Sequence, residues 1–69
     1  MLELTSQDLE LVKYLALPDK EISEMLHYSI GSIRASKKRI FARLNVKNST
    51  HAVIKAWVYG LIEKEDIVL

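Results

Sequence analysis

Residues 18–44 read PDKEISEMLHYSIGSIRASKKRIFARL and predict two helices joined by a tight turn. Pro18 can open the first of them, because the first helical position needs no amide donor. The second begins after Ser29, a favoured N-cap residue, and runs to about Leu44. The turn needs one residue at positive φ, and His27 is the candidate because it tolerates that region better than most residues. Two helices with such a turn form a helix-turn-helix.

The two faces of the second helix differ in chemistry. One face carries apolar residues at helical spacing, and the other is small and basic. Small side chains allow a close approach to a groove, and basic ones attract a polyanion. The residues of this second face are Ser32, Arg34, Ala35, Lys38 and Arg39.

Two further helices flank this unit. The first begins at the N-cap Thr5, with Asp8 completing a capping box and Leu4 and Leu9 at staple spacing, and Pro18 ends it near residue 17. Asn45 can end the preceding helix in a left-handed conformation, and Asn48 or Ser49 caps a last helix over about residues 50–59, which ends at Gly60. No stretch alternates with period two, so we expect one all-α domain over residues 1–69.

The apolar stripes of the four helices predict the core. At most one stripe of each helix can face inward. In chain order we expect Leu11, Val12, Leu15 and Ala16, then Ile22, Met25 and Leu26, then Ile33, Ile40, Phe41 and Leu44, and finally Ala52, Val53, Ala56 and Tyr59.

The net charge of +1 hides a polarised chain. Residues 1–24, with Glu3 among their acids, carry six acids and two lysines, whereas residues 25–62 carry seven basic side chains and no acid. Clustered cations without interspersed acids are typical of a face that binds nucleic acid. A solvated helix face would mix in glutamates at i,i+4 spacing.

Composition excludes several other classes. Sixty-nine residues allow one small domain, and the absence of cysteine excludes disulfides and thiolate metal sites. The two histidines do not have metal-ligand spacing, and no nucleophile motif or glycine-rich phosphate loop is present, so we expect no enzyme, metal or cofactor. No signal peptide or apolar run of about 20 residues is visible, which predicts a cytoplasmic protein without a membrane span.

The order and spacing of several elements resemble the LuxR-type (GerE-like) DNA-binding domain. Leu4-Thr5 is similar to the family's opening, and Lys20-Glu21-Ile22-Ser23 to its Asn-Lys-Glu-Ile-Ala element. Ser32-Ile33-Arg34 stands where the family has Thr-Val-Lys. Arg43-Leu44 and Gly60-Leu61-Ile62 fit later elements. The chain departs from the pattern at Ser36, where a histidine is common, and at Lys37, where an apolar residue is usual.

The resemblance implies a four-helix LuxR-type helix-turn-helix domain that regulates bacterial transcription. It places the helix over residues 29–44 in the major groove of double-stranded DNA, and RNA polymerase is a further expected partner. Arg34, Ala35 and Lys38 match positions that face bases. The expected phosphate or backbone contacts are Lys20, Ser29, Ser32, Ser36, Lys37, Arg39, Lys47 and Asn48.

The last helix is apolar almost all round, and a small domain cannot bury all of it. The resemblance implies a dimer through this helix, and we expect a weak one, formed by Ile54, Trp57, Val58 and Leu61. The alternative is a protein-interaction module that keeps the helix-turn-helix fold and binds a partner through the same helix. A basic amphipathic helix on an acidic membrane is a third class, but the inner face of the recognition helix is needed for the core. The chain is either part of a larger regulator or a small free-standing one, and a start at Met1 favours the second.

Overall fold

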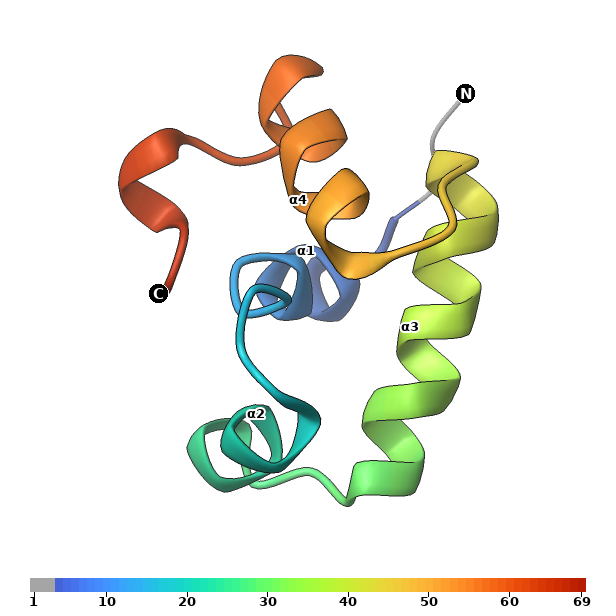
Figure 1. Ribbon diagram of the computed structural model, residues 1–69, viewed down its shortest axis with the longest axis vertical. Coiled ribbons are helices and arrows are strands. Elements are labelled where there is room, and N and C mark those ends of the chain that lie inside the picture. Colours follow the sequence, from blue (N-terminus) through green and yellow to red (C-terminus); the bar gives the residue numbers. More distant parts are fainter. Residues whose placement is uncertain (1–3) are drawn as a thin grey trace.

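The computed structural model describes residues 4–69, and all of its regular structure is helical (Figure 1). No strand occurs in this part of the chain, which confirms the all-α prediction. Glu3 lies outside the described residues. In chain order the elements are α1 Ser6–Val12, α2 Asp19–Leu26, α3 Ile30–Leu44, α4 Ser49–Val58 and the 3₁₀ helix η1 Lys64–Asp66.

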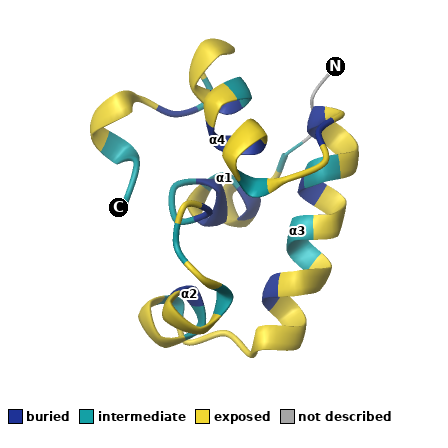
Figure 2. Cartoon of the chain, viewed as in Figure 1, coloured by how far each residue is buried: buried dark blue, intermediate teal, exposed yellow. Residues whose placement is uncertain are grey.

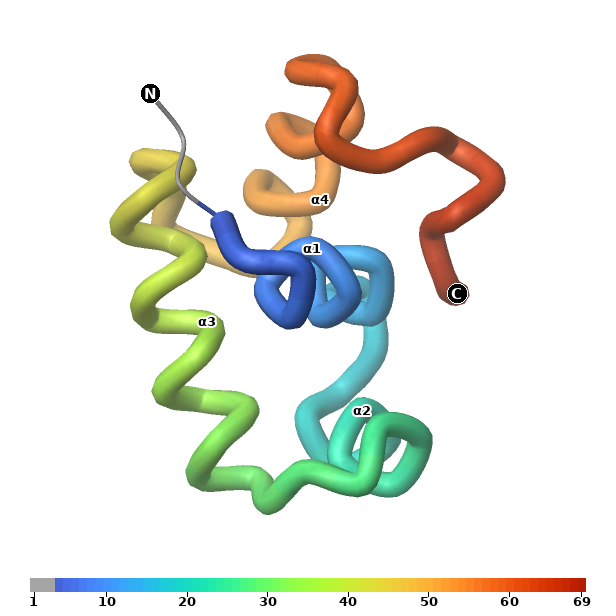
Figure 3. The backbone as a smooth tube through the Cα atoms, turned by 180° about the vertical axis from the view of Figure 1, so that it is seen from behind, coloured from blue at the N-terminus to red at the C-terminus, as the bar shows by residue number. Residues whose placement is uncertain are grey.

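The helices pack around α1, which lies in the middle of the molecule (Figure 1). Helix α3 runs along one side, and it packs against α2 near its beginning and against α4 near its end. The segment that follows α4 returns along the opposite side of α1, as the view from behind also shows (Figure 3). One whole side of α3 is therefore left without a neighbouring helix.

The helix-turn-helix forms as predicted. His27 ends α2 in the left-handed conformation with φ 61°, and the Ser29 side chain caps α3 by accepting the Ser32 amide. Pro18 is the N-cap of α2 rather than its first helical residue, with an extended ψ of 152°. The chain thus reverses between α2 and α3 without a glycine.

The C-terminal ends of α3 and α4 share one hydrogen-bonding pattern. Asn45 and Gly60 adopt left-handed conformations with φ 57° and 75°. The next amide in each case reaches back across the last turn, from Val46 to the Phe41 carbonyl at 2.9 Å and from Leu61 to the Ala56 carbonyl at 2.8 Å. This is the Schellman arrangement, in which an apolar residue after the left-handed one covers the helix end. The predicted ends of both helices are confirmed.

Helix α1 is shorter than predicted, because it ends at Val12 and not near residue 17. The following residues form tighter turns, in which the Leu15 amide bonds to the Val12 carbonyl at 3.3 Å and the Leu17 amide to the Tyr14 carbonyl at 3.0 Å. The Lys13 carbonyl, released from helical bonding, accepts the backbone amide of Val68 at 2.8 Å. Pro18 disfavours helix for the residue before it, and the C-terminal segment satisfies the freed carbonyl.

The core contains the predicted residues of α3 together with most of those expected from the other helices (Figure 2). Three expected core residues are exposed instead. Ala16 lies beyond the end of α1, so helical periodicity does not apply to it. Met25 is half exposed because α2 is short and buries only Ile22 fully. Tyr59 lies just past α4, where its ring stands 5.6 Å from the Lys55 ammonium and is largely solvated.

The C-terminal segment completes the core, which the helix stripes alone did not predict. Ile62 is buried, and Ile67 packs against the cluster from η1. Val46, in the loop after α3, is buried as well. The segment after α4 lies on the side of α1 that faces away from α3 (Figure 2).

Candidate nucleic-acid interface

The outer side of α3 is exposed, and no neighbouring helix covers it (Figure 2). Ile33, Ile40 and Leu44 point inward and are fully buried, as predicted. The opposite face exposes the Ser32 hydroxyl, the Ala35 methyl group and two cations, Arg34 and Lys38. The 15 residues of α3 span about 22 Å, which gives a ridge long enough to follow a DNA groove.

The start of α3 is held firmly against α2. The Ser23 hydroxyl donates to the Tyr28 carbonyl at 2.5 Å, which fixes the turn between the helices. Ser29 accepts the Ser32 amide at 3.1 Å, and the two hydroxyl oxygens lie 3.0 Å apart. Two exposed hydroxyls therefore stand at a helix N-terminus, where the dipole favours an anion.

An ion cluster joins the first residue of α2 to α3. One oxygen of Asp19 accepts the Lys37 ammonium at 2.7 Å, and the other lies 3.5 Å from Arg34 Nε. The hydrogen bond from Lys37 lowers the pKa of the Asp19 carboxyl; partial burial opposes this, and Arg34 adds to it. Lys37, which was expected at a DNA phosphate, thus joins the two helices through a salt bridge.

A second ion cluster lies at the other end of the domain and was not predicted. Asp8 is buried in α1, and its carboxylate accepts the Arg39 guanidinium at 2.5 Å, that of Arg43 at 3.2 Å and the Thr5 amide at 3.2 Å. Burial alone would raise the pKa of the Asp8 carboxyl, but the hydrogen bonds from Arg39 and Thr5, with the Arg39 charge, outweigh it and lower the pKa. The same contact raises the pKa of Arg39.

The sequence held a signal for this cluster. Asp8 lies three and four residues before Leu11 and Val12, so it falls on the stripe that faces the core. An acid on that stripe must find cations, and α3 supplies them. The structure therefore gives Arg39, expected at a DNA phosphate, an internal partner in α1.

The remaining expected DNA contacts are spread around α3. Lys20 is exposed on α2, and Ser36 is half buried on α3. Lys47 and Asn48 are exposed in the loop between α3 and α4, where the Asn48 side-chain oxygen caps α4 by accepting the His51 amide at 2.8 Å. The two serines at the start of α3 and this loop thus lie at opposite ends of the helix.

The outer face of α4 is apolar. Ile54, Trp57 and Val58 are exposed, with Val58 at 71%, whereas Ala52, Val53 and Ala56 are buried as predicted. Tyr59 extends the exposed face beyond the end of the helix. Leu61, expected on the same stripe, is half buried and packs against the core. Three large apolar side chains exposed on one ten-residue helix are more than a monomer usually leaves in water.

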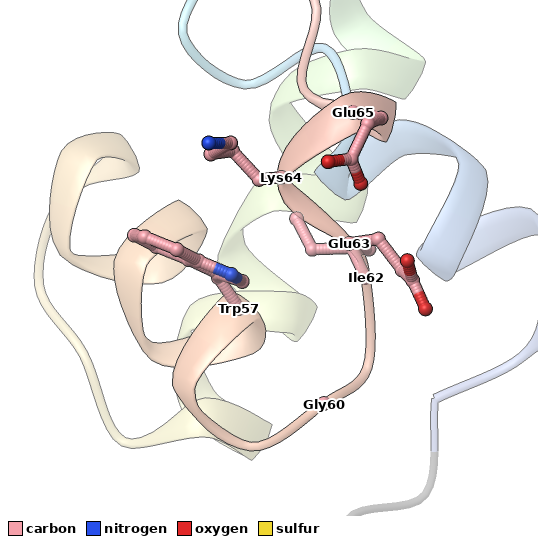
Figure 4. A pocket seen from close by; sticks show the side chains of 6 residues that line it. All are labelled: Trp57, Gly60, Ile62, Glu63, Lys64 and Glu65. Atoms are coloured by element: carbon pink, nitrogen blue, oxygen red, sulfur yellow. The ribbon is translucent and has the colours of Figure 1, made fainter.

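A pocket of about 340 Å³ borders this face and was not predicted. Trp57 lines one wall and the chain from Gly60 to Glu65 the other (Figure 4). Lys64 extends from η1 on the side that faces the indole (Figure 4).

Comparison with known families gives one match. A family model described as "Bacterial regulatory proteins, luxR family" (GerE) matches residues 2–56, which include α1, α2, α3 and most of α4. No curated protein and no solved structure matches the chain. Within residues 4–69, no helix is long and apolar enough to cross a membrane.

Proposed function

The chain belongs to the LuxR family of bacterial regulatory proteins, and we propose that it binds double-stranded DNA sequence-specifically with α3 in the major groove. The observation that carries this proposal is the exposed outer side of α3, which presents Arg34, Ala35 and Lys38 and no acid of its own. A helix about 10–12 Å across fits a major groove about 12 Å wide. Such a regulator acts in the cytoplasm, on the chromosome and beside RNA polymerase.

Base recognition follows from the chemistry of three side chains. Arg34 can donate two hydrogen bonds to the edge of a guanine. Lys38, one helical turn further along α3, can donate to the same kind of acceptor on another base. Ala35 can contact a thymine methyl group. All three are exposed, so binding does not require α3 to unfold or rotate.

Phosphate contacts would anchor α3 at both ends. The Ser29 and Ser32 hydroxyls lie at its N-terminus, and Lys47 and the Asn48 side chain lie beyond its C-terminus. We expect them to contact the two backbones that border the groove. Lys20 and Ser36 are further candidates. Lys37 and Arg39 would first have to leave Asp19 and Asp8, so we rank them last among the expected contacts.

Anisotropy titration with a selected duplex and a scrambled one tests the proposal. Arg34→Ala should weaken binding to the selected duplex by about 1–3 kcal/mol and flatten the preference at one base pair. Lys47→Ala, the matched cation off the proposed reading face, should weaken both duplexes alike. Equal affinity of the wild-type chain for both duplexes would contradict specific binding and leave the protein-interaction module as the better reading.

We also propose that two copies meet through the outer face of α4. A two-fold contact between the Ile54, Trp57 and Val58 stripes would cover the apolar surface and set two α3 helices about one DNA turn apart. A single helix pair buries little area, which supports a weak dimer that DNA completes.

Val58→Glu tests the dimer, because Val58 is exposed and its replacement should leave the fold intact. We expect the circular dichroism spectrum and melting temperature to stay nearly unchanged while cooperative binding to a paired site is lost. Met25→Glu, at an exposed apolar position on α2, is the control and should keep cooperativity. Cooperative binding by folded Val58→Glu would place the dimer elsewhere.

A further inference from the structure

Asp19 stands beside the proposed base-reading face although it is an acid. It is the first residue of α2, and its carboxylate faces α3 across the interface between the two helices. One oxygen is held by Lys37 at 2.7 Å, and the other faces Arg34 Nε at 3.5 Å. An unpaired acid at this place would repel DNA, so its position needs a reason.

Lys37 removes most of that repulsion. Its side chain is 19% exposed and bridges the two helices, so its charge is committed to Asp19. The pair is close to neutral toward an approaching phosphate, and the second carboxylate oxygen remains available. That oxygen is the one directed at Arg34.

Arg34 is anchored only on one edge. Its side chain is 73% exposed, and the contact with Asp19 is made through Nε, so it does not use the two terminal nitrogens. Bidentate recognition of guanine needs two parallel N–H donors presented together, and those terminal nitrogens provide them. The 3.5 Å separation is longer than a good hydrogen bond, so in the free chain the contact is an ion pair.

We propose that Asp19 is a positioning residue for Arg34, which holds the guanidinium by its Nε edge so that its two terminal nitrogens meet one guanine. This rests on the proposed function. A free arginine side chain samples many rotamers, and fixing it before binding reduces the ordering that DNA must impose. Lys37 supports this positioning because it neutralises the Asp19 carboxylate, which would otherwise repel DNA.

The test uses the whole chain and a random pool of duplexes of about 20 base pairs, long enough for two half-sites. The sequences enriched by the wild-type protein are compared with those enriched by Arg34→Ala. The comparison identifies the base pair at which the variant loses its preference. At that pair, we expect Asp19→Asn to reduce the preference for guanine by about three- to tenfold. Asp19→Glu keeps the charge and should restore part of the preference.

Two controls separate positioning from a structural role. Lys37→Gln breaks the bridge between α2 and α3 and leaves the Asp19 charge unneutralised, so it should lower the melting temperature and weaken binding to all duplexes. It keeps Asp19 beside Arg34, so the guanine preference should stay in place. In an Arg34→Ala background, Asp19→Asn should have no further effect on base preference, because the residue through which it acts is gone.

Four results would overturn the assignment. If Asp19→Asn weakens all duplexes equally, the residue is structural; if it strengthens binding to all of them, the carboxylate competes with DNA for Arg34. If the wild-type chain enriches a site and both Asp19→Asn and Asp19→Glu keep its guanine preference, only the positioning role is overturned. A wild-type chain that enriches no sequence overturns the proposed function, and this inference with it.

Discussion

Replacing Asp8 with asparagine should destabilise the domain in a way that depends on pH. The carboxylate is buried and accepts hydrogen bonds from Arg39, Arg43 and the Thr5 amide, whereas the carboxamide keeps one oxygen and directs an N–H₂ group at the guanidinium groups. The side chain keeps its size, so the change removes charge and acceptors without opening a cavity.

The size of the stability loss follows from how far Asp8 and its two arginine partners are buried. Hydrogen bonds to a charged group contribute about 1.5–3 kcal/mol each when buried, and ion pairs with exposed partners about 0.2–1 kcal/mol. Because the Asp8 side chain is fully buried and the arginines are more than a third exposed, we expect a total loss of about 2–3 kcal/mol at neutral pH. A domain of 69 residues has a free energy of unfolding of about 3–10 kcal/mol, so the melting temperature should fall by about 10–20 °C.

The pH dependence identifies the charge as the cause. The folded state lowers the pKa of the Asp8 carboxyl, so its contribution is complete above the unfolded pKa of about 4 and is lost as the pH falls through the folded value. Urea unfolding followed by circular dichroism should therefore show a large difference between Asp8→Asn and wild type at about pH 7, shrinking toward about pH 2.

Asp66→Asn is the matched control, because Asp66 also caps a turn, by accepting the Glu63 amide at 3.1 Å. It should change stability by less than about 1 kcal/mol. A deficit in Asp8→Asn that stays the same at every pH would show that capping geometry, and not the carboxylate charge, stabilises α1 against α3. A variant as stable as wild type at about pH 7 would refute the buried ion cluster altogether.

Three further outcomes are expected. Duplex binding should weaken with salt along a log–log slope of about −4 to −5, measured by anisotropy between about 50 and 200 mM salt, and a slope near zero would remove the basic face from the mechanism. Ile40→Ala should cost about 2–5 kcal/mol in urea unfolding, while Ile54→Ala on the exposed face should cost far less; equal costs would mean that the inner face of α3 is misassigned. His27→Gly should raise the free energy of unfolding by up to about 1 kcal/mol because it relieves a left-handed φ, whereas His27→Val should lower it, and the reverse order would contradict the turn geometry.

The local chemistry of the chain predicted the helix-turn-helix and most helix ends. Caps act through neighbouring residues, so Ser29, His27, Asn45 and Gly60 could be assigned from the sequence. The end of α1 could not, because the Lys13 carbonyl at that end bonds to the Val68 amide, which is more than fifty positions away. Tertiary partners of that kind leave no periodic pattern in the sequence.

The sequence predicted which residues of α3 are exposed better than it predicted which of them form ion pairs. The face with Arg34, Ala35 and Lys38 follows from helical periodicity once Ile33 and Ile40 are placed inward. The ion pairs of α3 do not, because they join side chains 15 or more positions apart, as Asp19 and Arg34 are. Clustered cations therefore overstated the charge that α3 has free for a ligand.

The hydrogen bond from Val68 to Lys13 also determines the direction in which the polypeptide leaves the domain. It fixes the C-terminal segment to the end of α1, so that Leu69 emerges on the side of α1 that faces away from α3 (Figures 1 and 3). A fluorophore, an affinity tag or a surface linker attached there would stand clear of a duplex lying along α3. Labelling at Leu69 is thus the attachment geometry that perturbs a binding measurement least, and a linker can be short without obstructing the groove-facing side.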